Sequence, residues 1–459
     1  MRFRDFLTDD NQVFILKGYA GTGKTTIVKE MIDLLETENL HFKLLASTGR
    51  AAKILANATG MKTTTVHGMI YTFSDLSQDI EKISEERQRT GIEPSGQLYL
   101  VFECGQVIHD KGQCFYFIDE ASMVSDVKDP YTTQAVFGSG KLLTDLFYYD
   151  PNGKFIFIGD AGQLPPVQQK ESPALSLPYI ENVCEKKATE SNLTQIMRQQ
   201  QGNDIIVAAQ HMRYLYLHPQ PMKWAKFKMR GFNNVHLLTN QIQLLQMYIE
   251  RIRKYGYNDS TMICFSNRQC GEITKLVRPA LGLKADTLQQ GDLLLVTQNN
   301  LITGLMNGDL VKVTNVGFRE MRAGLTFINV SVEEVITHKS YTTLMICEIL
   351  YSNQTNLTAQ QQKNLFIDFG MRMRANGIRQ KSRAFREAMF NDQYLNALRA
   401  VYGFALTCHK SQGGEWDNVF LDIPRNLPIQ SKPYVYQWMY TAMTRAKKEL
   451  YLVDDFYIM

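Results

Sequence analysis

The sequence predicts an α/β protein with two parallel-sheet units, each carrying a smaller β-rich insertion. In the first unit, short apolar runs end in glycine or acidic residues and alternate with helical segments up to about residue 196. A second series of this kind begins with the run Thr261 to Ser266. Between Leu288 and Val335 the hydrophobic period changes to two, with turn residues about ten positions apart, which predicts a small barrel inserted in the second unit.

Composition limits the functional classes. A chain of 459 residues is too long for one ordinary core, so about two to four domains are expected. The net charge of +4 permits nucleic-acid binding without predicting it. The seven cysteines are scattered and never spaced C-x-x-C, which favours reduced thiols over a metal site. No apolar stretch reaches the ~20 residues of a membrane span, so we expect a soluble, cytoplasmic protein.

The most specific local pattern is G-Y-A-G-T-G-K-T, from Gly18 to Thr25. An apolar run precedes it and a helical segment follows it, which is the context of a phosphate-binding loop. The backbone amides of such a loop surround a polyphosphate, while Lys24 reaches the β- and γ-phosphates and the Thr25 hydroxyl ligates Mg²⁺. The residues expected to bind the nucleotide are Gly18, Gly21, Thr22, Gly23, Lys24, Thr25 and Thr26.

Two further predicted strands end in groups suited to hydrolysis. The run C-F-Y-F-I-D-E ends in Asp119 and Glu120. In ATPases with this loop, an acid at a neighbouring strand end holds Mg²⁺, and a glutamate beside it accepts a proton from the attacking water. The strand Lys154 to Ile158 leads to G-D-A-G-Q, so Gln163 is expected at the same edge, where it can sense the γ-phosphate. The predicted catalytic residues are therefore Lys24, Asp119, Glu120 and Gln163, with Thr25 and Asp119 as metal ligands.

Three other features are less specific, and two of them have two interpretations. His67, in T-T-T-V-H-G, is either a capping or packing residue or a functional group. The basic, aromatic stretch His211 to Arg230 fits a surface helix or part of a nucleic-acid groove. The charged run between Arg372 and Arg386 fits a solvated helix face.

Residues 72–113 interrupt the alternation and predict a small insertion on the first sheet. Within it, the apolar run between Gly96 and Gly112 looks like a hairpin. Its aromatic residues Tyr99 and Phe102 either stack against a terminal base pair or face inward and hold the hairpin to the sheet.

The ordered set of motifs resembles that of the superfamily 1B DNA helicases, a family that includes the RecD subunit and the Dda helicase. The matching segments, in chain order, are G-Y-A-G-T-G-K-T, S-T-G-R-A-A, T-V-H, F-I-D-E-A-S, G-D-A-G-Q-L-P-P-V, M-R-Q, T-C-H-K-S-Q-G-G-E-W and Y-T-A-M-T-R-A-K. Their agreement in order covers nearly the whole chain and is far more specific than any single motif.

The resemblance implies two RecA-like motor domains with ATP in the cleft between them. Residues 1–71 and 114–196 would form motor domain 1A, and residues 72–113 the inserted pin-like domain 1B. Residues 197–283 and 400–459 would form motor domain 2A. Residues 284–350 would form an SH3-like barrel, domain 2B, and residues 351–399 its helical basic extension.

The resemblance also implies roles for residues that the local patterns leave open. Arg198 and Arg445 would act as arginine fingers, and Glu415 would contact the nucleotide sugar. The DNA track would be lined by Thr48, His67, Asn267, Thr407 and His409, and Tyr99 and Phe102 would belong to the strand-separating pin. The implied cofactors are ATP and Mg²⁺. The implied partners are single-stranded DNA and its junctions with duplex, with 5′-to-3′ movement by a monomer and with replication or repair proteins as associates.

Two positions depart from the family pattern. About a dozen residues precede the first strand, where members carry a helix with an adenine-recognising glutamine, and Gln12 lies too close to Phe14 for that role. Ser47 stands where proline is common in the DNA-contacting motif. Preference for ATP over other nucleotides is therefore left open.

Two alternative functions use the same loop. The chain would be the motor subunit of a helicase–nuclease complex, with the nuclease on a partner chain, or a small-molecule kinase or GTPase switch that is not coupled to nucleic acid. A switch protein needs one α/β unit only. The second unit, with Arg445, therefore favours a motor.

Overall fold

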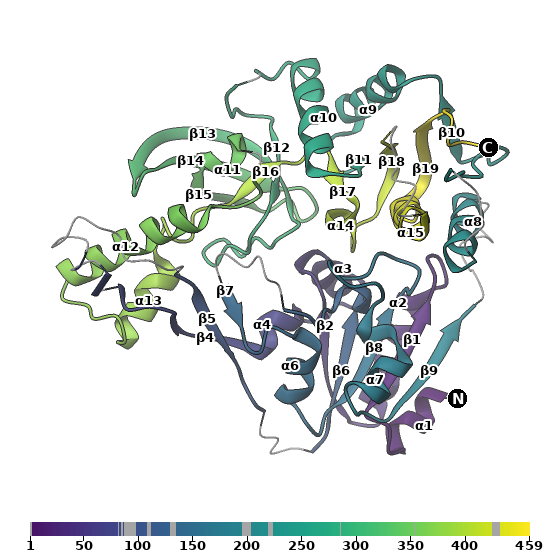
Figure 1. The fold of residues 1–459 in the computed structure, drawn as a ribbon, viewed down its shortest axis with the longest axis horizontal. Helices are drawn as coiled ribbons and strands as arrows, with labels where there is room; N and C mark the ends of the chain where they lie inside the picture. Colours follow the sequence, from purple (N-terminus) through teal and green to yellow (C-terminus); the bar gives the residue numbers. More distant parts are fainter. Residues whose placement is uncertain are drawn as a thin grey trace.

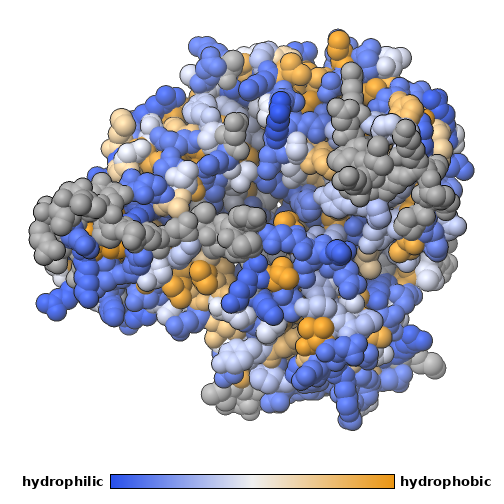
Figure 2. Space-filling view, in the orientation of Figure 1, coloured by the Kyte–Doolittle hydropathy of each residue, from blue (hydrophilic) through white to orange (hydrophobic). Residues whose placement is uncertain are grey.

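The computed structural model describes residues 2–80, 82–83, 86, 98–107, 112–128, 135–194, 203–218, 224–284, 286–352, 354–424 and 432–459. Two parallel sheets with their helices form the right-hand half of the molecule in Figure 1, one below the other. A β-barrel lies beside the upper sheet, and helices α12 (Ala359–Ala375) and α13 (Arg383–Asn391) lie at the far left. Figure 2 shows that this face is mainly hydrophilic, with small, separate hydrophobic patches.

The first sheet contains the predicted phosphate-loop strand. Its strand order is β3-β2-β6-β8-β1-β9, and every pairing is parallel. The strands are β1 (Val13–Gly18), β2 (His41–Ala46), β3 (Thr63–Thr65), β6 (Cys114–Asp119), β8 (Lys154–Gly159) and β9 (Ala188–Leu193). The helices of this unit are α1 (Arg2–Thr8), α2 (Lys24–Thr37), α3 (Gly49–Thr59), α4 (Val66–Ile70), α6 (Leu142–Tyr149) and α7 (Leu177–Asn182).

Alternate side chains of β1 enter two separate cores. Val13 and Ile15 pack with the core on one face, and Phe14 and Leu16 pack with the core on the other. A sheet covered on both faces makes its strands continuous apolar runs, which is why Phe14 to Leu16 is recognisable in the sequence.

The second sheet is also parallel, in the order β10-β19-β18-β11-β17. Its strands are β10 (Val235–Leu238), β11 (Ser260–Cys264), β17 (Leu406–Thr407), β18 (Trp416–Asp422) and β19 (Ala446–Val453). Its helices are α8 (Ile205–Leu217), α9 (Gln241–Tyr255), α10 (Asn267–Ala280), α14 (Cys408–Ser411) and α15 (Lys432–Met443). The predicted pair of parallel-sheet units is confirmed.

The inserted barrel is an antiparallel sheet in the order β15-β14-β13-β12-β16. Its strands are β12 (Leu293–Val296), β13 (Leu310–Arg322), β14 (Leu325–Glu334), β15 (Ser340–Ile346) and β16 (Ala400–Tyr402), and helix α11 (Cys347–Tyr351) follows β15. Leu398, just before β16, exchanges backbone hydrogen bonds with Leu344 and Ile346, so the two edges meet. Strand β16 begins the segment 400–459, which we assigned to the second motor domain. It nevertheless belongs to the barrel, because it pairs with β12.

The small sheet near the pin-like region differs from the predicted hairpin. Strand β5 (Leu100–Cys104) pairs with β4 (Tyr71–Leu76) on one side and β7 (Ala135–Phe137) on the other. Its partners therefore lie outside the run from Gly96 to Gly112, and residues 87–97 and 108–111 lie outside the described residues. The sheet packs on α12 and α13 through a shared core that includes Phe73, Phe366 and Phe385.

The basic run from Arg372 to Arg386 is not a uniformly solvated face. Arg372 forms ion pairs with Asp368 and Asp392 and is partly buried, because α12 and α13 meet there. Arg383, by contrast, is exposed and pairs with Glu387 one turn later. The prediction of a solvated face is therefore wrong at Arg372. Within the described residues, no helix combines the length and hydrophobicity needed to cross a bilayer.

The two parallel-sheet units are joined through the loop that follows β8. Within the described part of the chain, four hydrogen bonds connect this loop to the second unit: Tyr440 Oη to Asp160 Oδ2 (2.5 Å), Gln437 Nε2 to Gln163 O (2.8 Å), Leu164 N to Thr441 Oγ1 (2.9 Å) and Gln412 Nε2 to Leu164 O (3.0 Å). The Leu164 side chain is buried in the core of the second unit. We call this contact between residues 160–164 and helices α14 and α15 the interdomain junction.

Tyr440 extends the junction to the phosphate-binding loop. Its hydroxyl donates to Asp160 and accepts a hydrogen bond from Ala20 N at 3.2 Å. Asp160 is 1% exposed, and its other oxygen accepts from Gly162 N. One phenol therefore connects α15 with two loops of the first sheet.

Tyr440→Phe should lower the stability of the protein. The substitution leaves a buried carboxylate oxygen of Asp160 without its donor, which typically costs about 1–3 kcal/mol. The measurement is the thermal midpoint, with Tyr436→Phe as control, since Tyr436 is equally buried on the same helix but its hydroxyl accepts a long hydrogen bond, 3.3 Å from Lys226 N. Equal midpoints for the two variants would show that the bond to Asp160 contributes little.

A second prediction concerns His67, which packs in an aromatic cluster. Its ring centroid lies 5.6 Å from that of Tyr71 and 5.4 Å from that of Phe137. Burial lowers the pKa of His67 to about 4. The His67 side chain of the unfolded chain binds a proton near pH 6.5, whereas that of the folded chain does not. The free energy of unfolding that His67 contributes is therefore present above pH 6.5 and is lost as the pH falls toward 4.

His67→Gln should therefore reduce the acid sensitivity of the thermal midpoint. Between pH 7 and pH 5, protonation of His67 in the unfolded chain lowers the free energy of unfolding of the unsubstituted protein by an amount on the order of 1–2 kcal/mol. Midpoints recorded at both pH values would show a smaller decrease for the variant. An unchanged decrease would contradict a neutral His67 that is packed against Tyr71 and Phe137.

Candidate functional site

The phosphate-binding loop connects β1 to α2. Gly21 and Gly23 both have φ near 78°, a conformation that favours glycine, and Gly23 caps α2. A Cβ at Gly18 would lie 2.7 Å from Thr22 Oγ1, so the loop is too tight there for a side chain. The sequence pattern therefore folds into the curved loop that it predicts.

Lys24 folds back over this loop. Its Nζ donates to Gly18 O at 2.8 Å and Tyr19 O at 3.2 Å, and Thr22 Oγ1 donates to Tyr19 O at 2.8 Å. Thr25 and Thr26 are exposed in the first turn of α2. The cation and the helix N-terminus thus lie together, which suits a polyphosphate.

The acidic pair lies at the end of β6. Asp119 Oδ1 accepts from Glu120 N at 2.9 Å, and Glu120 adopts φ 51°, which is uncommon for a residue with a side chain. Burial, helped by the charge of Glu120 and opposed by Lys24, raises the pKa of Asp119 to about 7. Ser47 supports this turn, because its Oγ donates to Glu120 O at 2.8 Å. The sequence did not predict this role for Ser47.

Gln163 lies in the interdomain junction. Its side chain is 4% exposed, and Oε1 is buried without a hydrogen-bond partner among the described residues. A buried acceptor of this kind is costly unless something donates to it. A water molecule held for attack on a phosphate would be such a donor.

The predicted arginine fingers are placed differently from the other catalytic residues. Arg198 lies in the segment 195–202, outside the described residues. Arg445 is 3% exposed and donates to Thr441 O, Gly414 O and Thr444 Oγ1, all within the second unit. In this conformation it is held by its own unit. Glu415, next to Gly414, is exposed.

The predicted DNA-track residues share a position at the start of helices that follow parallel strands. Thr48 caps α3 by accepting from Ala51 N, and Thr407 caps α14 by accepting from Lys410 N. Asn267 is the first residue of α10, and His409 lies within α14. A Cβ at Gly413 would lie 3.2 Å from Thr48 Oγ1, so the two units meet along this line. His67 also lies at the start of a helix, as the second residue of α4 after β3, but its ring packs on Tyr71 and Phe137.

The predicted pin residues also differ from each other. Phe102 stacks on Phe137 with ring centroids 4.7 Å apart and packs edge-on against Phe73. It therefore takes the inward-facing role that we considered as the alternative. Tyr99 is half-buried, and its backbone pairs with Ser77.

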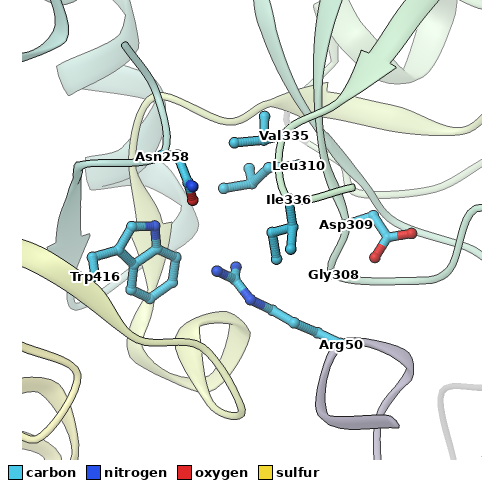
Figure 3. Close-up of a pocket in the computed structure, with 8 residues that line it drawn as sticks. All are labelled: Arg50, Asn258, Gly308, Asp309, Leu310, Val335, Ile336 and Trp416. Carbon is cyan, nitrogen blue, oxygen red and sulfur yellow. The ribbon is translucent and has the colours of Figure 1, made fainter. Parts of the chain in front are cut away.

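The sequence did not predict a charged cluster that lies between α3, the barrel and β18. Arg50 is buried there with its guanidinium carbon 4.2 Å from the ring centroid of Trp416, and Asp309 lies in the same pocket (Figure 3). The half-buried Lys53 forms an ion pair with Asp309. Burial lowers the pKa of Arg50 to about 10, and the carboxylates of Asp309 and Glu334 oppose that effect. The R in S-T-G-R-A-A and the W in G-G-E-W were visible in the sequence, but their contact was not.

Gln12 is engaged away from the loop. Its Nε2 donates to Pro151 O at 3.1 Å, and its backbone oxygen accepts from Phe155 N. Its side chain therefore supports the start of β8.

Comparisons with known proteins agree with this arrangement. A family model described as an AAA domain matches residues 2–214, and one described as a UvrD-like helicase C-terminal domain matches residues 402–453. The ATP-dependent RecD2 DNA helicase of Deinococcus radiodurans is 28% identical over 214 residues, which are 47% of this chain and 23% of the relative. The RecBCD enzyme subunit RecD of Buchnera aphidicola is 24% identical over 98% of this chain and 71% of its own length.

Among solved structures, a Pif1 helicase from Bacteroides in complex with ADP-AlF3 and single-stranded DNA aligns with a TM-score of 0.48 and 15% identity, covering 99% of this chain and 91% of that one. In the order of its motifs, in the two family models that match successive parts of the chain and in its RecD matches, this protein is similar to the RecD-like helicases of superfamily 1B.

Proposed function

We propose that the chain is an ATP-driven DNA helicase that moves 5′ to 3′ on single-stranded DNA and separates duplex ahead of it. The observation that carries the proposal is the interdomain junction, in which Tyr440 of the second unit reaches the tip of the phosphate-binding loop. A nucleotide bound in that loop would therefore be sensed by both units. The name of the Deinococcus relative, an ATP-dependent DNA helicase, points to the same activity.

The residues of the cleft fit Mg²⁺ and a triphosphate. Thr25 presents an exposed hydroxyl, and the Asp119 carboxylate lies near enough to Lys24 to feel its charge. These two side chains would hold Mg²⁺, which would neutralise charge between the β- and γ-phosphates. Lys24 would exchange its bonds to the loop carbonyls for bonds to phosphate.

Hydrolysis would use Glu120 and Gln163. Glu120 accepts the proton of the attacking water, and Gln163 Oε1 orients that water. Arg198 and Arg445 stabilise the charge that develops on the γ-phosphate. For Arg445, this requires release from its three acceptors in the second unit, so the active conformation differs at that side chain.

DNA would cross the helix starts at Thr48, Asn267, Thr407 and His409. Backbone amides at helix N-termini bind phosphates without regard to sequence, as a translocase requires. Burial lowers the pKa of His409, so this residue would act as a neutral group. His67 would affect binding through the packing of α4.

A motor subunit in a larger complex is the second candidate, because the RecBCD enzyme subunit RecD matches over 98% of this chain. The isolated chain distinguishes the two. Strand separation by the purified protein alone supports a self-sufficient helicase, whereas hydrolysis without strand separation supports a subunit that needs partners.

Lys24→Ala should lower DNA-stimulated ATP hydrolysis by at least about a hundredfold, because it removes the cation facing the β- and γ-phosphates. Binding of an oligonucleotide without nucleotide should be nearly unchanged, since Lys24 belongs to the phosphate-binding loop and not to the helix starts at α3, α10 and α14 that the DNA would cross. The assay compares turnover with and without added single-stranded oligonucleotide. If the unsubstituted protein hydrolyses ATP at the same rate with and without the oligonucleotide, the motor function is refuted.

The direction of movement can be tested separately. A partial duplex with a 5′ single-stranded tail should be opened and one with a 3′ tail should not. The two substrates contain the same duplex, so stability of the base pairs is matched. Preferential opening of the 3′-tailed substrate would contradict the 1B direction and leave the ATPase proposal intact.

A further inference from the structure

Helix α8 brings a further cation, Arg213, to the tip of the phosphate-binding loop. Its guanidinium carbon lies 3.3 Å from the ring centroid of Tyr19, the second residue of G-Y-A-G-T-G-K-T. A Cβ at Gly162 would lie 3.5 Å from Arg213 Cδ. Arg213 therefore lies against both loops that would surround the terminal phosphate, although it comes from the second unit.

The Arg213 side chain has unused hydrogen-bonding capacity. Its Nη1 atom is buried without a hydrogen-bond partner among the described residues, and none of the described carboxylates forms an ion pair with it. The nearby carboxylate of Asp160 is already occupied by Tyr440 and Gly162. The face of Tyr19 attracts a cation but accepts no hydrogen bond in the plane of the guanidinium. An anion at this position would complete the site.

We propose that Arg213 contacts the terminal phosphate of the bound nucleoside triphosphate and rests on Tyr19 when no nucleotide is bound. This inference rests on the proposed ATPase function and adds a residue to it. The chemistry favours phosphate because Lys24 and the loop amides would bind the β- and γ-phosphates in the loop to which Tyr19 belongs, and a guanidinium fork matches phosphate oxygens in two parallel bonds. Arg213 acts by charge and takes part in no covalent step.

If Arg213 contacts the terminal phosphate, its substitution should affect ligands that carry this group more than ligands that lack it. A role in packing alone would not distinguish the two kinds of ligand. ADP lacks that group, whereas ADP with aluminium fluoride mimics it. Arg213→Ala should change the Kd for ADP by less than about threefold and weaken binding of ADP with aluminium fluoride by about tenfold or more, since the lost interaction is charge-assisted. Arg213→Lys keeps the charge and loses the fork, so an intermediate loss is expected.

The measurement is titration of each variant with a fluorescent ADP, with and without aluminium fluoride and Mg²⁺, in the absence of DNA. Arg230→Ala is the matched control, because Arg230 belongs to the same unit but pairs with Asp454 at the surface. If Arg213→Ala fails to fold, the same comparison of the two ligands is made with Arg213→Lys.

Equal weakening of both ligands would overturn the proposal, since it would indicate contact with the base or a packing role. No weakening of either would overturn it as well. The failure of the proposed function is recognised independently: a protein that binds both ligands but shows no DNA-stimulated hydrolysis would refute the motor while leaving the role of Arg213 standing.

Discussion

The arrangement of the two parallel-sheet units depends on a polar loop of the first unit that is buried against the core of the second unit. Residues 160–164 leave the first sheet, and Leu164 enters the core of the second unit. Backbone groups that enter a core need partners, since an unpaired one costs about 1–3 kcal/mol. Gln412, Gln437 and Thr441 supply those partners for the backbone of Gln163 and Leu164. The relative position of the two sheets is therefore fixed by directional bonds as well as by apolar packing.

This constraint brings functional groups from distant parts of the chain to one cleft. Because parallel strands end at the same edge of a sheet, the phosphate-binding loop, the Asp119–Glu120 turn and residues 160–164 lie together on the first sheet. Tyr440 and Arg213 meet them from the second sheet. A change in the nucleotide would alter contacts of both units, which is the physical requirement for coupling hydrolysis to movement.

The parts of the site that sequence could predict are those encoded within one strand and its following turn. Gly18 to Thr25 and Asp119–Glu120 are of this kind, since the buried strand and the polar turn are adjacent in the chain. The contacts of Arg50 with Trp416, and of Arg213 with Tyr19, join residues far apart in the sequence. The sequence around each of these residues gives no indication of the contact that it makes.

The errors in the fold have the same origin. The barrel was predicted from its alternating residues, but strand β16 is separated from the other strands by α12 and α13. Strand β5 was assigned to a local hairpin, whereas it pairs with β4 and β7. Local patterns identify strands, while pairing depends on which apolar faces the whole chain covers.

Asp160 and Tyr440 should behave as one energetic unit that connects the two sheets. A double-mutant cycle with Asp160→Asn, Tyr440→Phe and the combined variant tests it, with the DNA-stimulated ATPase rate and the thermal midpoint measured for each protein. If the two side chains act together, the combined variant should be little worse than the more damaged single variant, with a coupling free energy of about 1 kcal/mol or more. Losses that add, within about 0.3 kcal/mol, would contradict it.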